Sequence, residues 1–214
     1  SLSFDKWFCN QFLRAFDIPV AKSIFLSHID ELTHSEIIET LGLPIFVKPS
    51  DSGSSYGISK VKLASELNKA LKSAFKEGET VVFESFLDGT EVTCGVYQTK
   101  DGLQALPLTE IASENDFFDY EAKYLGKSQE ITPARISEDI AEKIRVVAKK
   151  AYTILKMSGF SRSEFIIVNG EPHMLEMNTI PGLTTESLIP QQAKVAGISL
   201  ADLFTNAIEL ALNN

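Results

Sequence analysis

Residues 160–178 constrain the fold most strongly, because their pattern predicts a β-hairpin that turns near Asn169-Gly170. Polar and apolar side chains alternate along both arms of this segment, as is typical of strands with one buried face. The polar positions are Arg162, Glu164, Glu176 and Asn178, and the apolar positions are Phe165, Ile167, Leu175 and Met177. We therefore expect an antiparallel β-ribbon whose polar groups gather on one face.

These four polar side chains meet only in one register of the hairpin. When Glu164 faces Glu176, Arg162 must face Asn178, and all four groups lie on one face. A two-residue turn would place Leu175 opposite Glu164, so the register requires a three-residue loop centred on Gly170 or a β-bulge. Two carboxylates and an amide oxygen then form an all-oxygen site that suits Mg²⁺. The alternative is a solvated strand end with an Arg–Glu ion pair.

The rest of the chain mixes helical and strand patterns without the regular alternation of a doubly wound sheet. Helices are predicted at 5–16, 35–42, 65–77, 137–157, 186–195 and 200–212, and strands at 20–26, 80–87, 91–99 and 103–111, with a further hairpin at 45–61. We therefore expect an α+β protein. The polar stretch 112–130 has no clean period and is long for a connection, which is typical of a functional lid.

Composition excludes several classes of protein. The 214 residues carry a formal net charge of −9 without any lysine–arginine block, so nucleic acid is not an expected partner. No apolar run approaches the ~18 residues of a membrane span, so no membrane association is expected. Cys9 and Cys94 are isolated, and we expect buried thiols in a reducing cytoplasm. The chain begins at Ser1 without an initiator methionine, so we expect a fragment of a longer protein.

The hairpin at 45–61 encloses a loop rich in glycine, serine and aspartate. Its glycines allow a ligand to approach the backbone N–H groups, and Ser54 and Ser55 add two hydroxyls. Lys48 precedes the loop on a strand. The pattern suits a phosphate cradle, and a flexible polar turn is the alternative.

Two further segments carry groups that suit a ligand. Glu84 and Glu91 flank a short link between strands, where one acid can accept hydrogen bonds from an adenine amino group and the other from ribose hydroxyls; any exposed connection has the same spacing. Farther along, a turn at Pro181-Gly182 precedes Ser187 at a helix start. The free N–H groups of a helix N-terminus bind a carboxylate readily. Simple N-capping is the alternative.

Four segments resemble the ATP-grasp part of D-alanine–D-alanine ligases in their sequence, order and separation. They are VKPSDSGSSYG, FESFLDGTE, FDYEAKY and EMNTIPGLTTESLIP. The opening SFDK resembles the family's helix whose lysine reaches the nucleotide phosphates. The resemblance implies an ATP-grasp fold of two α+β lobes with the nucleotide cleft between them. The lobes are expected at 1–93, with a phosphate loop at 49–57, and at 94–214, with the lid loop 112–130 and the metal hairpin 160–178.

The same resemblance implies roles for individual residues. Those implied to hold ATP are Lys6, Lys48, Ser55, Glu84, Phe86, Leu87, Glu91, Lys123 and Leu175. Those implied to bind two Mg²⁺ ions, for which Mn²⁺ can substitute, are Glu164, Glu176 and Asn178. Those implied to act in catalysis are Arg162 and Gly182, at the oxyanion, and Ser54 and Tyr124, which pair to close the site. Those implied to receive the carboxylate of the second D-alanine are Ser187 and Leu188.

The activity implied by the resemblance is ATP-dependent ligation of two D-alanines through an acyl phosphate, for peptidoglycan synthesis in the cytoplasm. Glu164 departs from the family's usual aspartate, and the family's N-terminal domain, which helps to hold the first D-alanine, is missing. We therefore expect an incomplete fragment, inactive alone, of a protein that is a homodimer when full length. The alternatives are another ATP-grasp carboxylate–amine ligase and a nucleotide-binding module without activity in isolation.

Overall fold

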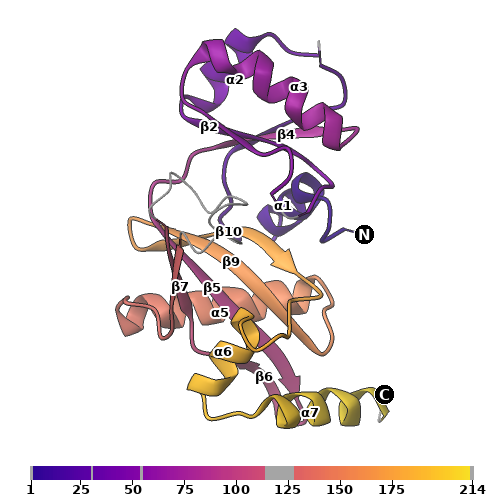
Figure 1. Ribbon diagram of the computed structural model, residues 1–214, viewed down its shortest axis with the longest axis vertical. Coiled ribbons are helices and arrows are strands. Elements are labelled where there is room, and N and C mark those ends of the chain that lie inside the picture. Colours follow the sequence, from indigo (N-terminus) through magenta and orange to yellow (C-terminus); the bar gives the residue numbers. More distant parts are fainter. Residues whose placement is uncertain (1, 30, 54, 114–127, 213–214) are drawn as a thin grey trace. The chain divides into compact units, whose positions relative to one another are not determined.

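The computed structural model describes residues 2–29, 31–53, 55–113 and 128–212. This part of the chain separates into two compact units: unit 1 comprises the described residues up to Asp88, and unit 2 comprises the residues 89–113 and 128–212. Each unit has an antiparallel sheet and helices of its own (Figure 1). The α+β class expected from the sequence is therefore confirmed.

Unit 1 is built on a four-stranded sheet in the order β1-β4-β2-β3. Its strands are β1 (Ser23–Leu26), β2 (Ile45–Pro49), β3 (Ser59–Val61) and β4 (Val81–Ser85). Its helices are α1 (Lys6–Arg14), α2 (His34–Leu41), the 3-10 helix η1 (Ala64–Glu66) and α3 (Leu67–Glu77). Because β2 and β3 pair as antiparallel neighbours, the hairpin predicted at 45–61 is confirmed.

The core of unit 1 lies between its sheet and two helices. α2 and α3 lie on the same side of this sheet (Figure 1), and α3 packs on β2, β3 and β4. Apolar residues recur along α3 every three or four positions, so they share one face. That buried face consists of Leu67, Ala70, Leu71 and Ala74. It packs in one cluster with Phe83 of the sheet and Ile37 of α2, and burial of each such large side chain contributes about 1.5–3 kcal/mol.

Local caps fix where the first two helices begin. The Asp5 side chain accepts a hydrogen bond from the Phe8 N–H at the start of α1. Thr33 and Glu36 form a reciprocal capping box at the start of α2, and Gly42 ends that helix with a φ of 74°. Each cap of this kind stabilises a helix by about 1 kcal/mol. These boundaries therefore follow from the local sequence.

Unit 2 is built on a larger sheet in the order β10-β9-β5-β7-β8, with β6 also paired to β5. Its strands are β5 (Thr90–Thr99), β6 (Gly102–Ala105), β7 (Thr109–Ser113), β8 (Ser128–Ile131), β9 (Phe160–Val168) and β10 (Glu171–Asn178). Its helices are α5 (Glu138–Ile154), α6 (Leu188–Val195) and α7 (Leu200–Leu212). α5 follows the N-cap Ser137, at the start of the helix predicted at 137–157, and packs against β5, β6, β9 and β10 (Figure 1).

The single strand predicted at 103–111 is wrong, because this segment forms two strands. β6 pairs with the end of β5, from Val96 to Thr99, whereas β7 pairs with its beginning at Val92 and Thr93. Pro107 lies between them, and proline has no N–H to donate to a β-ladder. The ladder therefore stops at this residue and resumes beyond it.

α6 and α7 are the last two helices that the structure describes, and the chain bends by 104° between them. Ile189 of α6 and Leu203 of α7 share an apolar cluster with Leu106. No single helix within the described ranges is long and apolar enough to cross a membrane, and this bent pair meets that criterion by length and composition only.

Candidate functional site

The β9–β10 hairpin combines a two-residue turn with a β-bulge. Asn169 and Gly170 form the turn with φ values of 51° and 79°, the left-handed region that asparagine and glycine tolerate best. The pairing then shifts between Met174 and Glu176, which leaves Leu175 as the extra residue of the bulge. The bulge, and not a three-residue loop, therefore sets the register of the polar residues.

In this register the four polar side chains meet as predicted. Glu164 faces Glu176, and Arg162 faces Asn178. The amide Nδ2 of Asn178 donates to Oε1 of Glu164 at 3.1 Å and to Oε1 of Glu176 at 3.2 Å. The Arg162 guanidinium donates to Glu164 and forms an ion pair with it. We call Arg162, Glu164, Glu176 and Asn178 the polar quartet.

The charges of the polar quartet favour a bound cation. The Arg162 and Glu164 side chains are only 18% and 10% exposed, so their charges are partly shielded from water. Two carboxylates against one guanidinium leave an excess of negative charge, and like charges directly opposite on a sheet are destabilising. A divalent cation would remove this repulsion.

The donor atoms of the polar quartet also fit Mg²⁺. Carboxylate and amide oxygens are hard ligands of the kind that Mg²⁺ prefers. Within the described ranges, no three histidine, cysteine, aspartate or glutamate side chains form a group that can hold a metal. A metal held here would therefore depend on two carboxylates supplemented by the Asn178 amide oxygen.

The start of α6 brings the predicted oxyanion residue Gly182 close to the two predicted substrate residues, Ser187 and Leu188. A Cβ atom on Gly182 would lie 2.7 Å from the Ser187 hydroxyl oxygen, so the two residues are in close contact. Ser187 is the N-cap of α6, but its side chain makes no capping hydrogen bond. Its hydroxyl instead lies 2.9 Å from that of Thr184. The N–H groups of the first turn, which begins at Leu188, are therefore not satisfied by the N-cap side chain.

In unit 1, Lys48 and Glu84 form a buried ion pair. Nζ of Lys48 lies 2.6 Å from Oε2 of Glu84, and the two side chains are 13% and 3% exposed. Nδ2 of Asn10, which is itself buried, donates to Oε1 of Glu84 at 3.3 Å. Breaking a buried pair of this kind costs about 3–5 kcal/mol. The structure thus joins two predicted nucleotide residues to each other.

Lys6 contacts the predicted phosphate loop. Its ammonium group donates to the Ser52 carbonyl, and its backbone N–H donates to the Ser50 carbonyl at 2.8 Å. Ser55, farther along the same loop, has a φ of 60°. The lysine at the start of α1 and the loop at 49–57 are therefore adjacent, as the phosphate role requires.

The link predicted to hold adenine begins in unit 1. Phe86 donates its N–H to the Pro44 carbonyl at 3.2 Å, and the Lys60 ammonium lies 3.9 Å from the centre of its ring. Leu87 next to it is half-buried. Glu91 belongs to unit 2, where it lies on β5 opposite Ile166.

Three predicted site residues, Ser54, Lys123 and Tyr124, lie outside the described residues. The described ends of the predicted lid stretch are strand residues. Ala112 pairs with Gln129, and Ser113 pairs with Ser128, as part of the ladder between β7 and β8.

Asn10 is a residue of this region that the sequence patterns did not indicate. It lies four positions after Lys6 on α1, so both side chains lie on the same side of the helix. That spacing was the available signal, but it does not identify Glu84, 74 residues away, as the partner.

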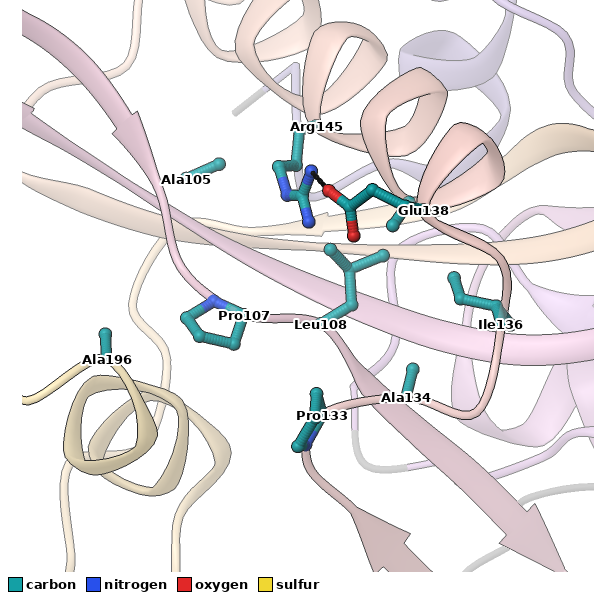
Figure 2. A pocket seen from close by; sticks show the side chains of 10 residues that line it. Ala105, Pro107, Leu108, Pro133, Ala134, Ile136, Glu138, Arg145 and Ala196 are labelled. Atoms are coloured by element: carbon teal, nitrogen blue, oxygen red, sulfur yellow. Dashed lines mark hydrogen bonds and ion pairs between the residues drawn. The ribbon is translucent and has the colours of Figure 1, made fainter.

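Unit 2 also has a groove of about 360 Å³ (Figure 2). It is lined by Ala105, Pro107, Leu108, Pro133, Ala134, Ile136, Glu138, Ala141, Arg145 and Ala196. The Arg145–Glu138 ion pair, at 2.7 Å, lies on the side of the groove formed by α5 (Figure 2). None of the predicted site residues that the structure describes lines this groove.

Comparison with known proteins identifies the family of this chain. Residues 12–209 match the model of the family described as the D-ala D-ala ligase C-terminus. A D-alanine–D-alanine ligase of Flavobacterium johnsoniae is 61% identical over 99% of this chain, and one of Christiangramia forsetii is 53% identical over 100%. The chain spans 66% and 65% of the length of these two relatives.

Solved structures agree with this match. A D-alanine–D-alanine ligase of Bacillus anthracis complexed with ATP has a TM-score of 0.84 at 28% identity, covering 99% of this chain and 67% of that one. The VanG D-Ala:D-Ser ligase of Enterococcus faecalis has a TM-score of 0.86 at 34% identity, covering 98% and 62%. The chain therefore belongs to the D-alanine–D-alanine ligase family and matches its C-terminal part.

Proposed function

We propose that this chain supplies the ATP-handling part of a ligase that joins two D-alanines into D-alanyl-D-alanine for peptidoglycan synthesis. The observation that carries the proposal is the polar quartet, in which Glu164 and Glu176 face each other beside Arg162 and Asn178. The relatives' names supply the substrate, D-alanine.

The reaction requires a carboxylate to become electrophilic. The γ-phosphoryl group of ATP passes to the carboxylate of the first D-alanine, which gives an acyl phosphate and ADP. The amine of the second D-alanine then attacks the acyl carbon, and phosphate leaves as the peptide bond forms. The obstacle is charge, because two like charges ~4 Å apart repel by about 4 kcal/mol at an effective dielectric constant of ~20.

Cationic side chains offset this repulsion. Lys6 and Lys48 contact the phosphates, and Glu84 keeps Lys48 in place through the buried ion pair. Glu164, Glu176 and Asn178 would hold Mg²⁺, with Mn²⁺ as a substitute, and the ion would supply charge neutralisation at the phosphates.

Residues of unit 2 stabilise the acyl-transfer step. Arg162 and the Gly182 N–H donate to the oxyanion that forms when the amine attacks. The carboxylate of the second D-alanine binds at Ser187 and the first N–H groups of α6, starting at Leu188, where the helix dipole favours an anion. We place the protein in the cytoplasm, as a homodimer in its complete form.

The test is an ADP-release assay of the complete gene product with product analysis. We expect Mg·ATP and D-alanine to give ADP and D-alanyl-D-alanine in equal amounts. A product formed preferentially with D-serine or another amine would indicate a different carboxylate–amine ligase. Binding of Mg·ATP without ADP release would indicate a nucleotide-binding module, and either result would contradict the proposal.

A further inference from the structure

We propose that Gln192 is a positioning residue, which holds the N-terminus of α6 where the acceptor carboxylate binds. This inference rests on the proposed function, which places that carboxylate at Ser187 and Leu188. Gln192 does not contact substrate in this account. It acts through the helix that carries those residues.

The Gln192 amide is buried, and both its oxygen and its nitrogen form hydrogen bonds. Its side chain is 0% exposed. The Gly95 N–H donates to its Oε1 at 3.0 Å, and its Nε2 donates to the Thr93 carbonyl at 3.1 Å and to the Thr109 hydroxyl at 3.0 Å. One side chain of α6 therefore binds both β5 and β7.

These hydrogen bonds fix how closely α6 approaches the sheet. A Cβ atom on Gly95 would lie 2.6 Å from Cδ1 of Ile189 and 2.7 Å from Oε1 of Gln192, so only glycine allows this contact. If α6 moved outward, the buried Gly95 N–H would lose the Gln192 oxygen and the buried Gln192 amide would lose its partners in the sheet, and burying an unpaired polar group is costly. The helix is thus held at one depth.

The constraint reaches the first turn of α6. Gln192 follows Leu188 by four residues, so the two lie on the same side of the helix, one turn apart. A helix of eight residues moves as a rigid element, so a shift at Gln192 shifts the N–H groups at its start. Displacements of ~1 Å can cost about 10²-fold in rate when they misplace binding groups.

The main test is Gln192→Met in the complete gene product, because methionine has a similar length without hydrogen-bonding groups. We expect the half-saturating concentration of the second D-alanine to rise about tenfold, equivalent to ~1.4 kcal/mol. The KM for ATP should stay within about twofold, since none of the groups that Gln192 contacts belongs to a residue proposed to hold ATP or Mg²⁺. Both constants come from steady-state dipeptide synthesis: D-alanine is varied at saturating ATP and fitted to sequential binding of two D-alanines, and ATP is varied at saturating D-alanine.

Two variants of Thr109 extend the test, and they decide it if Gln192→Met does not fold. Thr109→Val removes one acceptor of the Gln192 amide, so we expect a smaller rise in the half-saturating concentration of the second D-alanine. Thr109→Ser keeps the hydroxyl, and it should restore the wild-type constant for the second D-alanine.

Tyr152→Phe is the matched structural control. It removes a hydrogen bond from the buried Tyr152 hydroxyl to the Gly159 carbonyl, at 3.0 Å, in the same unit. We expect a lower thermal midpoint with unchanged kinetic constants. If Tyr152→Phe raises the acceptor constant as much as Gln192→Met does, the effect is general destabilisation and the inference is wrong.

The remaining outcomes separate this inference from the proposed function. A wild type that forms no dipeptide contradicts both. A wild type that forms dipeptide, with a folded Gln192→Met that keeps the wild-type acceptor constant, contradicts the positioning role alone. An equal rise in the constants for ATP and for the second D-alanine also overturns it.

Discussion

Glu176 lies directly opposite Glu164, although a two-residue turn closes their hairpin. The bulge at Leu175 shifts the last part of β10 by one residue and brings the two carboxylates to the same face. Asn178 donates to both carboxylates, and Arg162 pairs with Glu164. Each of these contacts offsets part of the repulsion that a cation would remove entirely.

Glu176→Gln should abolish ligation while leaving the fold intact. The amide keeps the shape of the side chain but removes the charge that would hold Mg²⁺, so we expect dipeptide synthesis to fall by about 100-fold or more. Circular dichroism should remain that of the wild type. Glu171→Gln makes the same substitution on the same strand, at an exposed ion pair with Lys143, and should keep wild-type activity. Near-normal turnover of Glu176→Gln at saturating Mg²⁺ would falsify the metal role.

Asn10→Asp should destabilise the protein at neutral pH. The substitution replaces the amide donor with a carboxylate about as close to Glu84 as the present 3.3 Å contact, in a buried setting. We expect a loss of about 2–4 kcal/mol in the free energy of unfolding at pH 7, measured by urea denaturation. Protonation of the introduced aspartate relieves the repulsion, so the difference in unfolding free energy from wild type should narrow as pH falls.

Gln11→Glu is the control for this prediction. Gln11 is the next residue of α1, and its amide donates to the Ser23 hydroxyl at 3.1 Å. A hydroxyl can donate to a carboxylate instead, so we expect little loss of stability. Equal losses in the two variants would mean that the Glu84 contact is not the cause.

The stability of the protein should fall in acid, because protonation of Glu110 removes a stabilising contact. Hydrogen bonds from the Arg135 side chain, at 3.0 and 2.6 Å, hold the pKa of Glu110 below its ordinary value of 4.5. A lowered pKa in the folded state means that this stabilisation is fully present above about pH 4.5 and is lost as pH falls through the lowered pKa. Glu110→Gln should therefore lower the thermal midpoint by about 2–4 °C at pH 7.

The pH dependence identifies the cause of that effect. The difference in midpoint between wild type and Glu110→Gln should shrink below pH 4.5, because the wild-type carboxyl is then protonated as well. Glu138→Gln, at an ion pair with Arg145 in which the carboxylate side chain is 79% exposed, should change the midpoint much less. A difference at Glu110 that stays constant down to pH 3 would rule out the ionic contribution.

The two thiols should not react in the folded protein. Burial raises the pKa of the Cys94 thiol to about 12, although Arg145 and Lys149 act in the opposite direction. Cys9 is also buried, with 2% of its surface exposed. Because the thiolate is the reactive form, a disulfide reagent at pH 8 should label neither residue until denaturant is added. Rapid labelling of one equivalent without denaturant would show that a thiol is accessible.

The hairpin marks the limit of what pattern alone predicts. Alternation along 160–178 placed the polar residues on one face, and it left a three-residue loop and a bulge as the two ways to align them. The structure has the bulge. Both solutions satisfy the same local rules, so the choice between them depends on how β10 packs.

Local sequence determined the elements whose signals act over a few residues: the caps of α2 and α5, the apolar face of α3 and the turn at Asn169-Gly170. It failed at Pro107, where one predicted strand is two. Tertiary structure decided the contacts of Asn10 with Glu84 and of Gln192 with Gly95, which lie 74 and 97 residues apart in the chain. The physical reason is range: periodicity and capping are encoded in neighbouring residues, whereas a buried polar group finds its partner only after whole elements have packed.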